Sequence, residues 1–316
     1  MQRFVLIDGN AILHRAFHAL PPLTSKNGEL VNAVYGFFSM FLKILQDVKP
    51  TYLAVCFDRA APTFRQQLYV GYQAQRPKTA DELVPQIDLI HKILEKMKVS
   101  IFEIDGYEAD DLIGTIAYQI QNSKFKIQNL EVIIVSGDRD MLQLVNSHVK
   151  ALMPITGITK MQLFNSEAVE EKYGIKPTQI VDYKALVGDA SDNYPGVSGI
   201  GPKTASNLLK EFKTLEKIFQ SLSEIKKKNE GLAKKLAEGG EAAGLAKKLA
   251  EIVTDAPITL DIERCSVLHF DIEGAKECFS ELGFKSLLKR LLDKNPSEKK
   301  ENPIKKENSQ LGLLDI

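Results

Sequence analysis

The chain has 316 residues, of which 44% are hydrophobic and 26% are charged, a composition typical of a globular protein with room for two domains. No apolar run approaches the ~20 residues of a membrane-spanning helix, and Met1-Gln2-Arg3 does not begin a secretory leader, so we expect a cytoplasmic protein with no membrane partner. The 41 basic and 41 acidic residues give zero net charge, which counts against nucleic-acid binding unless the charges are unevenly distributed.

The first half of the chain alternates strand-like and helix-like segments. Apolar runs at 4–7, 53–57 and 132–135 predict buried strands, and the helical spacing of apolar residues from 33 to 48 predicts a helix that Pro50 ends. Such alternation favours a parallel sheet covered by helices on both faces, so the predicted fold class is α/β.

An aspartate follows each of the three predicted strands, at Asp8, Asp58 and Asp138. Ligands bind at this edge of open α/β sheets. One such aspartate is more often a helix cap, but three at one edge would repel one another unless cations neutralise them. The pattern therefore favours a cation site.

Between residues 60 and 85 the apolar periodicity fails, and aromatic residues alternate with basic ones from Phe64 to Lys78. This mixture suits a single nucleic-acid strand, because bases stack on rings while cations meet phosphates. A solvated surface loop explains the segment equally well.

Further carboxylates gather in three short motifs, at 106–111, 136–140 and 188–193. Glu108, Asp110 and Asp111 lie within four positions at a predicted helix start, which is more than capping requires. Alternate spacing can direct Asp138 and Asp140 to one side. Asp189 and Asp192 share a face of one turn.

Ligands that are all oxygen favour hard cations such as Mg²⁺ or Mn²⁺ over zinc. His14 and His18 have the spacing of a helical zinc pair but lack the accompanying glutamate. Three cysteines without close pairs predict reduced thiols. Two hard cations ~3.5–4 Å apart can activate water and stabilise the leaving oxygen of a phosphodiester. The chain has no Walker motif.

Helices dominate the second half, with short ones predicted at 166–173, 177–187 and 202–212. The string GLAKKLAE occurs at 231–238 and again at 244–251, and we interpret the copies as two amphipathic helices rather than a solenoid. From residue 293 onward Lys, Glu, Asn and Pro dominate, which predicts a disordered tail.

The string from Gly196 to Ala205, GVSGIGPKTA, predicts a tight turn followed by a helix whose first position is proline. Free amides at a helix start bind phosphate, and a nearby lysine adds charge. The pattern is that of a helix-hairpin-helix, which grips a DNA backbone without reading its sequence. The alternative is an ordinary glycine-rich turn. The predicted contacts are Gly196, Val197, Gly199, Gly201, Lys203 and Thr204.

Five ordered motifs resemble the 5′ nuclease domain of bacterial DNA polymerase I and its free-standing relatives in the flap endonuclease superfamily. They are LIDGNAILHRAFHAL, FDRAAPTFR, GYEADDLIGTIA, VSGDRDMLQLV and VGDASDNYPGVSGIGPKTA. The resemblance covers about residues 3–292. It implies a PIN-like catalytic domain at 1–165 with a helical arch at about 60–85, a helical DNA-binding region at 166–292, and the tail.

The resemblance also implies roles for individual residues. Asp8, Asp58, Glu108 and Asp110 match the ligands of a first metal ion, and Asp110, Asp138, Asp140 and Asp192 match those of a second, with Asp111 and Asp189 close behind. Arg15 and Arg76 match phosphate-contacting cations, and Tyr72 matches a residue that stacks near the displaced nucleotide. The hairpin is similar to an element that often holds K⁺ through backbone carbonyls.

The chain departs from the family at one arch position. The family commonly has Tyr-Lys-x-x-Arg, whereas Tyr72 and Arg76 here enclose Gln73 in place of the lysine. Glutamine hydrogen-bonds but carries no charge, so the effect of this change on the cleavage rate is left open. Lys78 is a candidate to supply the missing charge instead.

The end of the tail, from Gln310 to Ile316, is similar to short peptides that dock on bacterial sliding clamps, with Leu314 where such peptides have phenylalanine. The contacts would be Gln310, Leu311, Leu313 and Leu314. The alternative is a stray apolar terminus.

Three functions remain in view. The first is a monomeric enzyme that removes 5′ flaps and RNA primers from DNA in replication and repair. The second is a structure-specific DNA-binding module with weak catalysis, which only Gln73 favours. The third is a PIN-type ribonuclease, which explains neither the arch segment nor the hairpin. The complete set of acids favours the first.

Overall fold

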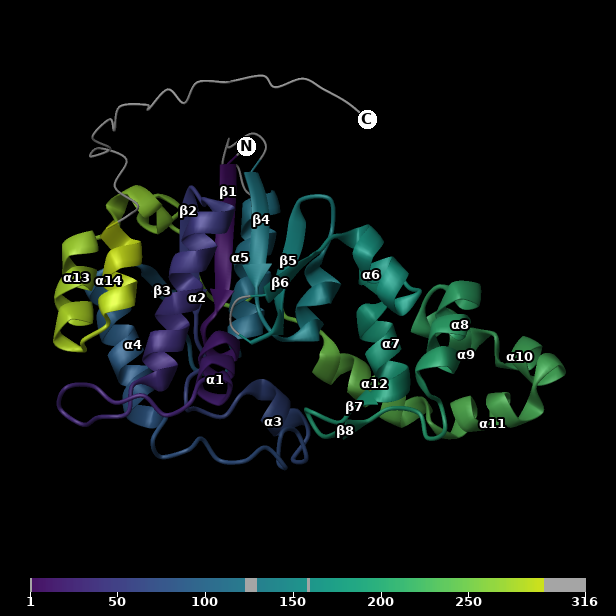
Figure 1. Cartoon of the computed structure of the whole chain (residues 1–316). Helices are drawn as coiled ribbons and strands as arrows, with labels where there is room; N and C mark the ends of the chain where they lie inside the picture. The colour runs from purple at the N-terminus through teal and green to yellow at the C-terminus, as the bar shows by residue number, and fades with distance from the viewer. Residues whose placement is uncertain (1, 123–129, 158–159, 293–316) are drawn as a thin grey trace, which may run out of the picture.

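A six-stranded sheet forms the centre of the computed structural model, which describes residues 2–122, 130–157 and 160–292 (Figure 1). The strand order is β3-β2-β1-β4-β5-β6; the first five strands run parallel and β6 is antiparallel to β5. The bounds are β1 Gln2–Asp8, β2 Tyr52–Cys56, β3 Ser100–Phe102, β4 Leu130–Val135, β5 Val149–Thr156 and β6 Lys160–Phe164. The predicted α/β class is confirmed, whereas the β5–β6 hairpin was not predicted.

Helices cover both faces of the sheet, which explains why β1 is apolar without alternation from Phe4 to Ile7. Val5 and Ile7 face α1 (Gly9–Ala19), α2 (Asn32–Val48) and α4 (Val84–Lys96) in one core. Phe4 and Leu6 point the other way and pack with α5 (Ala109–Asn122) in a second core. The short helix α3 (Phe64–Leu68) lies at the bottom of Figure 1, beyond the carboxyl ends of the strands.

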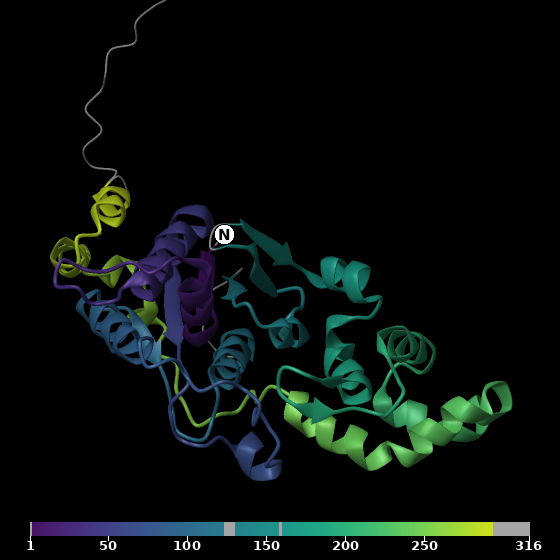
Figure 2. The same ribbon diagram turned by 60° about the horizontal axis from the view of Figure 1, so that its bottom comes forward.

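A helical region follows the sheet and extends to one side of it (Figures 1 and 2). Its elements are α6 Ser166–Tyr173, α7 Ile180–Val187, α8 Pro202–Phe212, α9 Leu215–Gln220, α10 Leu222–Lys228, α11 Glu230–Glu238 and α12 Gly240–Ala250. The predicted helices at 166–173 and 202–212 are present, and the one predicted at 177–187 consists of a 3₁₀ turn (Pro177–Gln179) followed by α7; the two copies of GLAKKLAE fall on α11 and α12. Among the described residues, no helix is both long enough and apolar enough to cross a bilayer.

The chain then returns from the helical region to the sheet. Ile252, Leu260 and Cys265 pack into the core on the α5 side. Helices α13 (Ile272–Glu281) and α14 (Lys285–Leu292) pack into the core on the α2 side. Part of the region predicted as helical at 166–292 thus also contributes to the two cores of the sheet. All three cysteines are free and buried.

Candidate metal centre

The carboxylates Asp8, Asp58, Glu108 and Asp110 form a first group at the carboxyl edge of the sheet. Asp8 ends β1 and caps α1, where its Oδ1 accepts a 2.9 Å hydrogen bond from the amide of Ala11. Asp58 follows β2, and its Oδ1 accepts a 2.7 Å bond from the amide of Ala109 at the start of α5. This bond joins the segment after β2 to the start of α5, which places Glu108 and Asp110 near Asp58.

The first group concentrates negative charge, and three of its four carboxylates are largely shielded from water, whereas Asp58 is exposed. Burial, together with the charges of Asp58 and Asp138, raises the pKa of Asp8 from 3.8 to about 7. Burial raises the pKa of Glu108 as well, and it raises that of Asp110 well above the usual range. Neighbouring carboxylates that repel one another would suit a divalent hard cation, because such an ion would neutralise them together.

Thermal unfolding can detect the electrostatic repulsion among these carboxylates in the metal-free protein. Because the pKa values of Asp8 and Glu108 are raised by folding, their contribution to stability is complete below about pH 4 and is lost as the pH rises through about 7. Mg²⁺ is expected to raise Tm by roughly 3–6 °C near pH 8 and by much less near pH 5. Calorimetry at both values checks this, and equal shifts would contradict it.

Asp111 has a different environment from its neighbours, and this corrects its predicted place among the metal ligands. Its fully buried carboxylate receives two 2.8 Å hydrogen bonds from the guanidinium of Arg65. The amides of Val253 and Glu108 donate to the same two oxygens at 2.9 and 3.1 Å. Since both oxygens are already hydrogen-bonded, we assign Asp111 a structural role.

A second group consists of Asp138, Asp140, Asp189 and Asp192. Asp138 caps the 3₁₀ helix Arg139–Leu144 and accepts a 2.9 Å bond from the amide of Asp140. The other two come from a hairpin of β7 (Gly188–Asp189) and β8 (Tyr194–Pro195) that follows α7. Oxygens of Asp140, Asp189 and Asp192 lie within 4.8 Å of one another, close enough to share a metal ion.

Two cations approach the second group. Lys184 on α7 forms ion pairs with both Asp140 and Asp189. Arg76 donates a 2.7 Å hydrogen bond to Asp192. Burial alone would raise the pKa of Asp189, but the Lys184 ammonium lowers it below the usual range.

The predicted arch segment contacts the acids at several points. Tyr72 is 4% exposed, lies against Tyr194 and donates a 3.1 Å hydrogen bond to Glu108. Its predicted stacking position near a displaced nucleotide is therefore corrected to a buried one. The Gln73 side chain donates to Asp192 at 3.1 Å, and the Gln73 amide donates to the Asp192 carbonyl at 2.8 Å.

The other two predicted cations lie farther from the carboxylates. Arg15 on α1 donates a 2.7 Å hydrogen bond to the carbonyl of Gly157. Lys78 is exposed. Of the predicted phosphate-contacting residues, only Arg76 is bonded to a carboxylate of the site.

The predicted hairpin joins α7 to α8, and its backbone requires glycine. A Cβ on Gly196 would lie 2.4 Å from the Leu186 carbonyl oxygen, and Gly199 has a φ of +75°. Val197 is 3% exposed, and its side chain packs in the core of the helical region, where it supports the hairpin from within. Gly201 and Lys203, in contrast, are exposed at the start of α8.

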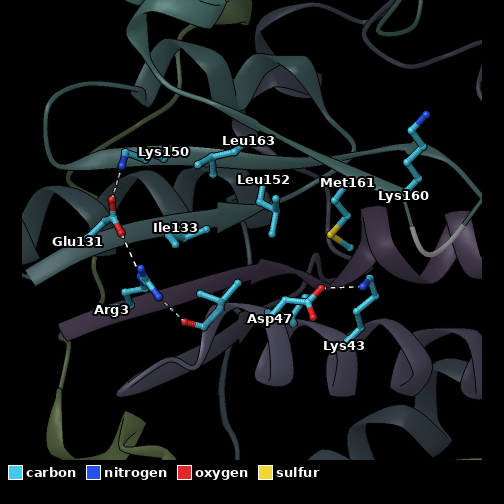
Figure 3. Close-up of a pocket in the computed structure, with 12 residues that line it drawn as sticks. Arg3, Lys43, Asp47, Glu131, Ile133, Lys150, Leu152, Lys160, Met161 and Leu163 are labelled. Atoms are coloured by element: carbon cyan, nitrogen blue, oxygen red, sulfur yellow. Dashed lines mark hydrogen bonds and ion pairs between the residues drawn. The ribbon is translucent and has the colours of Figure 1, made fainter. Parts of the chain in front are cut away.

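A cavity of about 620 Å³ lies elsewhere, between α2 and the strands β4 to β6 (Figure 3). Its floor is apolar, with Ile133 and Leu152 in it, and three of its rim cations are paired with acids on the same rim. None of the predicted site residues lines it. We therefore place the functional site at the carboxylates.

Sequence reasoning missed four residues that organise these carboxylates. They are Arg65, which holds Asp111; Lys184, which pairs with Asp140 and Asp189; and Thr63 and Ser136, whose hydroxyls donate to Glu108 at 3.1 Å and to Asp8 at 2.7 Å. Arg65 falls within the segment predicted to bind a single strand, yet it is 1% exposed. Thr63, Arg65 and Ser136 lie inside motifs quoted above, but their roles there were not predicted, and Lys184 lies outside all of those motifs.

The chain matches two family models in succession. Residues 3–174 match the 5′-3′ exonuclease N-terminal resolvase-like domain, and residues 175–273 match the 5′-3′ exonuclease C-terminal SAM fold. DNA polymerase I of Bacillus caldotenax is 43% identical over 305 residues. That match covers 96% of this chain but 34% of the polymerase, so the chain spans about a third of such relatives.

A shorter relative and two solved structures match along their lengths. The 5′-3′ exonuclease of Aquifex aeolicus is 37% identical over 291 residues, which are 92% of this chain and 96% of that protein. Phage T5 5′-exonuclease with bound zinc has a TM-score of 0.63 at 20% identity, covering 92% of this chain and 98% of that one. The catalytic core of Rad2 with a DNA substrate has a TM-score of 0.57 at 15% identity, covering 92% of each.

The solved structures share the fold, with its sheet and the helical region beside it. The family models and the curated relatives go further, because together they account for almost all of the described chain. This protein belongs to the 5′-3′ exonuclease family.

Proposed function

We propose that the chain is a metal-dependent 5′-3′ exonuclease and 5′ flap endonuclease that acts on DNA. The observation that supports this most is the juxtaposition of two carboxylate groups at the sheet edge with the hairpin between α7 and α8. Asp189 and Asp192 of the second group belong to the same loop that continues into the hairpin. A duplex held at the start of α8 would thus be in fixed register with the carboxylates.

The carboxylates of both groups would hold two Mg²⁺ or Mn²⁺ ions, which would activate water and stabilise the leaving oxygen when bound. The chain itself positions the substrate. Exposed amides and Lys203 at the start of α8 would contact the duplex backbone, and carbonyls of the hairpin would hold K⁺. Arg76, half exposed beside Asp192, would meet the scissile phosphate.

Cleavage of a double-flap DNA tests this proposal. With a 5′ label and Mg²⁺, the protein is expected to cut near the flap junction and leave a 3′-hydroxyl on the released strand. A chelator should abolish the cut. Blocking the 5′ end should slow cleavage of a flap whose single strand has to be threaded more than cleavage of a substrate with a recessed 5′ end. Tight flap binding without any cut would instead support a DNA-binding module.

Restoring a cation at position 73 is expected to raise the cleavage rate. Gln73→Lys would add a charge next to Asp192, where Arg76 already lies, and removal of one such stabilising group costs roughly 10²–10³ in rate. We expect single-turnover rates to increase about 10-fold or more, with little change in flap affinity. The neutral change Gln75→Ala, at an exposed neighbour, is the control. An unchanged rate would show that another group already supplies the charge.

We also propose that the enzyme acts as a monomer in replication and repair, and that its tail docks on a sliding clamp. The contacts Gln310, Leu311, Leu313 and Leu314 lie outside the described residues. Deleting residues 309–316 is expected to lower clamp affinity while leaving cleavage without a clamp unchanged. Equal clamp affinity of the full chain and the truncated protein in a pull-down titration would show that the tail does not bind the clamp.

A further inference from the structure

The ammonium of Lys184 lies inside the second carboxylate group. Its ion pairs with Asp140 and Asp189 use two of the three residues whose oxygens lie within 4.8 Å of one another. All three side chains of this contact are largely buried: Lys184 and Asp189 are each 13% exposed and Asp140 is 8% exposed. This is therefore not a loose surface pair, and breaking it would leave charges that are poorly solvated.

The third carboxylate of the group is also paired. Asp192 is bonded to Arg76 at 2.7 Å and to the Gln73 side chain at 3.1 Å. The side chains of Lys184 and Arg76 differ, however, in how freely they can move. Half of the Arg76 side chain is exposed, so it can turn toward solvent or substrate. Lys184, on α7, is only 13% exposed and pairs with two carboxylates of the group.

In the first group, the one ion-pair partner among the described residues is Arg65, which is held mainly by Asp111, outside the group. Among the residues that the structure describes, Asp8 and Asp58 have no ion-pair partner within 4.0 Å, and Arg65 is 3.7 Å from Glu108 and 3.9 Å from Asp110. Arg65 itself is fixed by Asp111. Asp8 and Asp58 would therefore rely on a bound cation to relieve their repulsion, whereas Lys184 already neutralises charge on Asp140 and Asp189 in the second group.

We propose that Lys184 is a tethered counter-ion of the second group. It holds Asp140 and Asp189 in place while that group is free of metal, and it has to withdraw before a divalent ion can take the same oxygens. The second group would then bind metal more weakly than the first, so that Lys184 sets the metal concentration at which both groups are filled. This inference rests on the proposed function, since it concerns the same carboxylates.

Titration with Mn²⁺ alone, without DNA, tests the proposal on the full chain. Electron paramagnetic resonance reports free Mn²⁺, and wild type is expected to show one tight and one weak equilibrium. Lys184→Met removes the charge but keeps the length of the side chain, and it is expected to tighten the weak equilibrium by about 10–100-fold, because one competing charge is gone. Lys184→Arg, which keeps the charge, should resemble wild type.

Thermal unfolding gives a second readout that does not depend on activity. Without metal, Lys184→Met leaves Asp140 and Asp189 unpaired, so its Tm should fall below that of wild type and of Lys184→Arg. Mn²⁺ should then raise the Tm of Lys184→Met more than that of wild type. Lys184→Gln provides the same comparison if the Met variant does not fold.

Failure of the Lys184 proposal can be distinguished from failure of the proposed metal-dependent function. If weak Mn²⁺ binding and metal-free Tm are the same in Lys184→Met as in wild type, Lys184 is not a counter-ion and the proposal is overturned. Weaker rather than tighter binding in Lys184→Met would also overturn it, because Lys184 would then be supporting the site. If no variant and no wild-type protein binds Mn²⁺, the proposed metal-dependent function fails as well.

Discussion

Asp110→Asn is expected to reduce flap cleavage at saturating Mg²⁺ by about 10²–10³-fold or more. Asp110 lies at the start of α5 between the two carboxylate groups, and its charge interacts with both Glu108 and Asp138. Asparagine keeps the shape and an acceptor for the amide of Asp111, which is 2.7 Å from Asp110 Oδ1. It removes only the charge that a metal ion would use.

The same substitution should stabilise the metal-free protein, because burial and neighbouring carboxylates disfavour the ionised form of Asp110. Loss of activity together with a higher metal-free Tm is the signature of a metal ligand. Asp105→Asn, at an exposed residue paired with Arg59 at 3.2 Å, is the matched control and should change neither property. Activity within about threefold of wild type in Asp110→Asn would exclude Asp110 from metal binding.

Arg65→Met is expected to destabilise the fold by about 3–5 kcal/mol, because it leaves the fully buried carboxylate of Asp111 without its partner. Arg65 also donates to the carbonyls of Leu249 and Glu251 at 2.9 and 2.8 Å. One side chain thus joins α3, the start of α5 and the chain segment that leaves α12. Its loss should loosen the arch segment and the return segment together.

A double substitution separates the buried charge from the lost contacts. Arg65→Met combined with Asp111→Asn removes both charges, and we expect it to recover roughly half or more of the stability that Arg65→Met loses. Urea unfolding of the four proteins gives the coupling energy. Strictly additive losses would mean that the two side chains do not act as a pair.

Much of the fold could be predicted because apolar periodicity is strong where segments are buried. The run at 4–7 is apolar on both faces since both faces of β1 are covered. The β5–β6 hairpin escaped prediction for the opposite reason. It lies at the sheet edge, many of its side chains are exposed, and Pro154 interrupts it, so its sequence is similar to that of a loop.

The site could be predicted only as far as residue type and order allow. The strand-end position of Asp8, Asp58 and Asp138 follows from the parallel sheet. The different roles of Asp110 and Asp111 do not, because they depend on Arg65, which is 46 positions away from Asp111. The pairing of Lys184 with Asp140 is equally invisible in the sequence, since it arises only when α7 packs beside the strand-end loops.

The return of the chain from α12 to the sheet has a consequence for dissecting the protein. Because Ile252, Leu260 and α13 to α14 complete the two cores of the sheet, the helical region is an insertion within the nuclease fold and not an appendage after it. A truncation at residue 174, where one family model ends, would expose apolar surface on both faces.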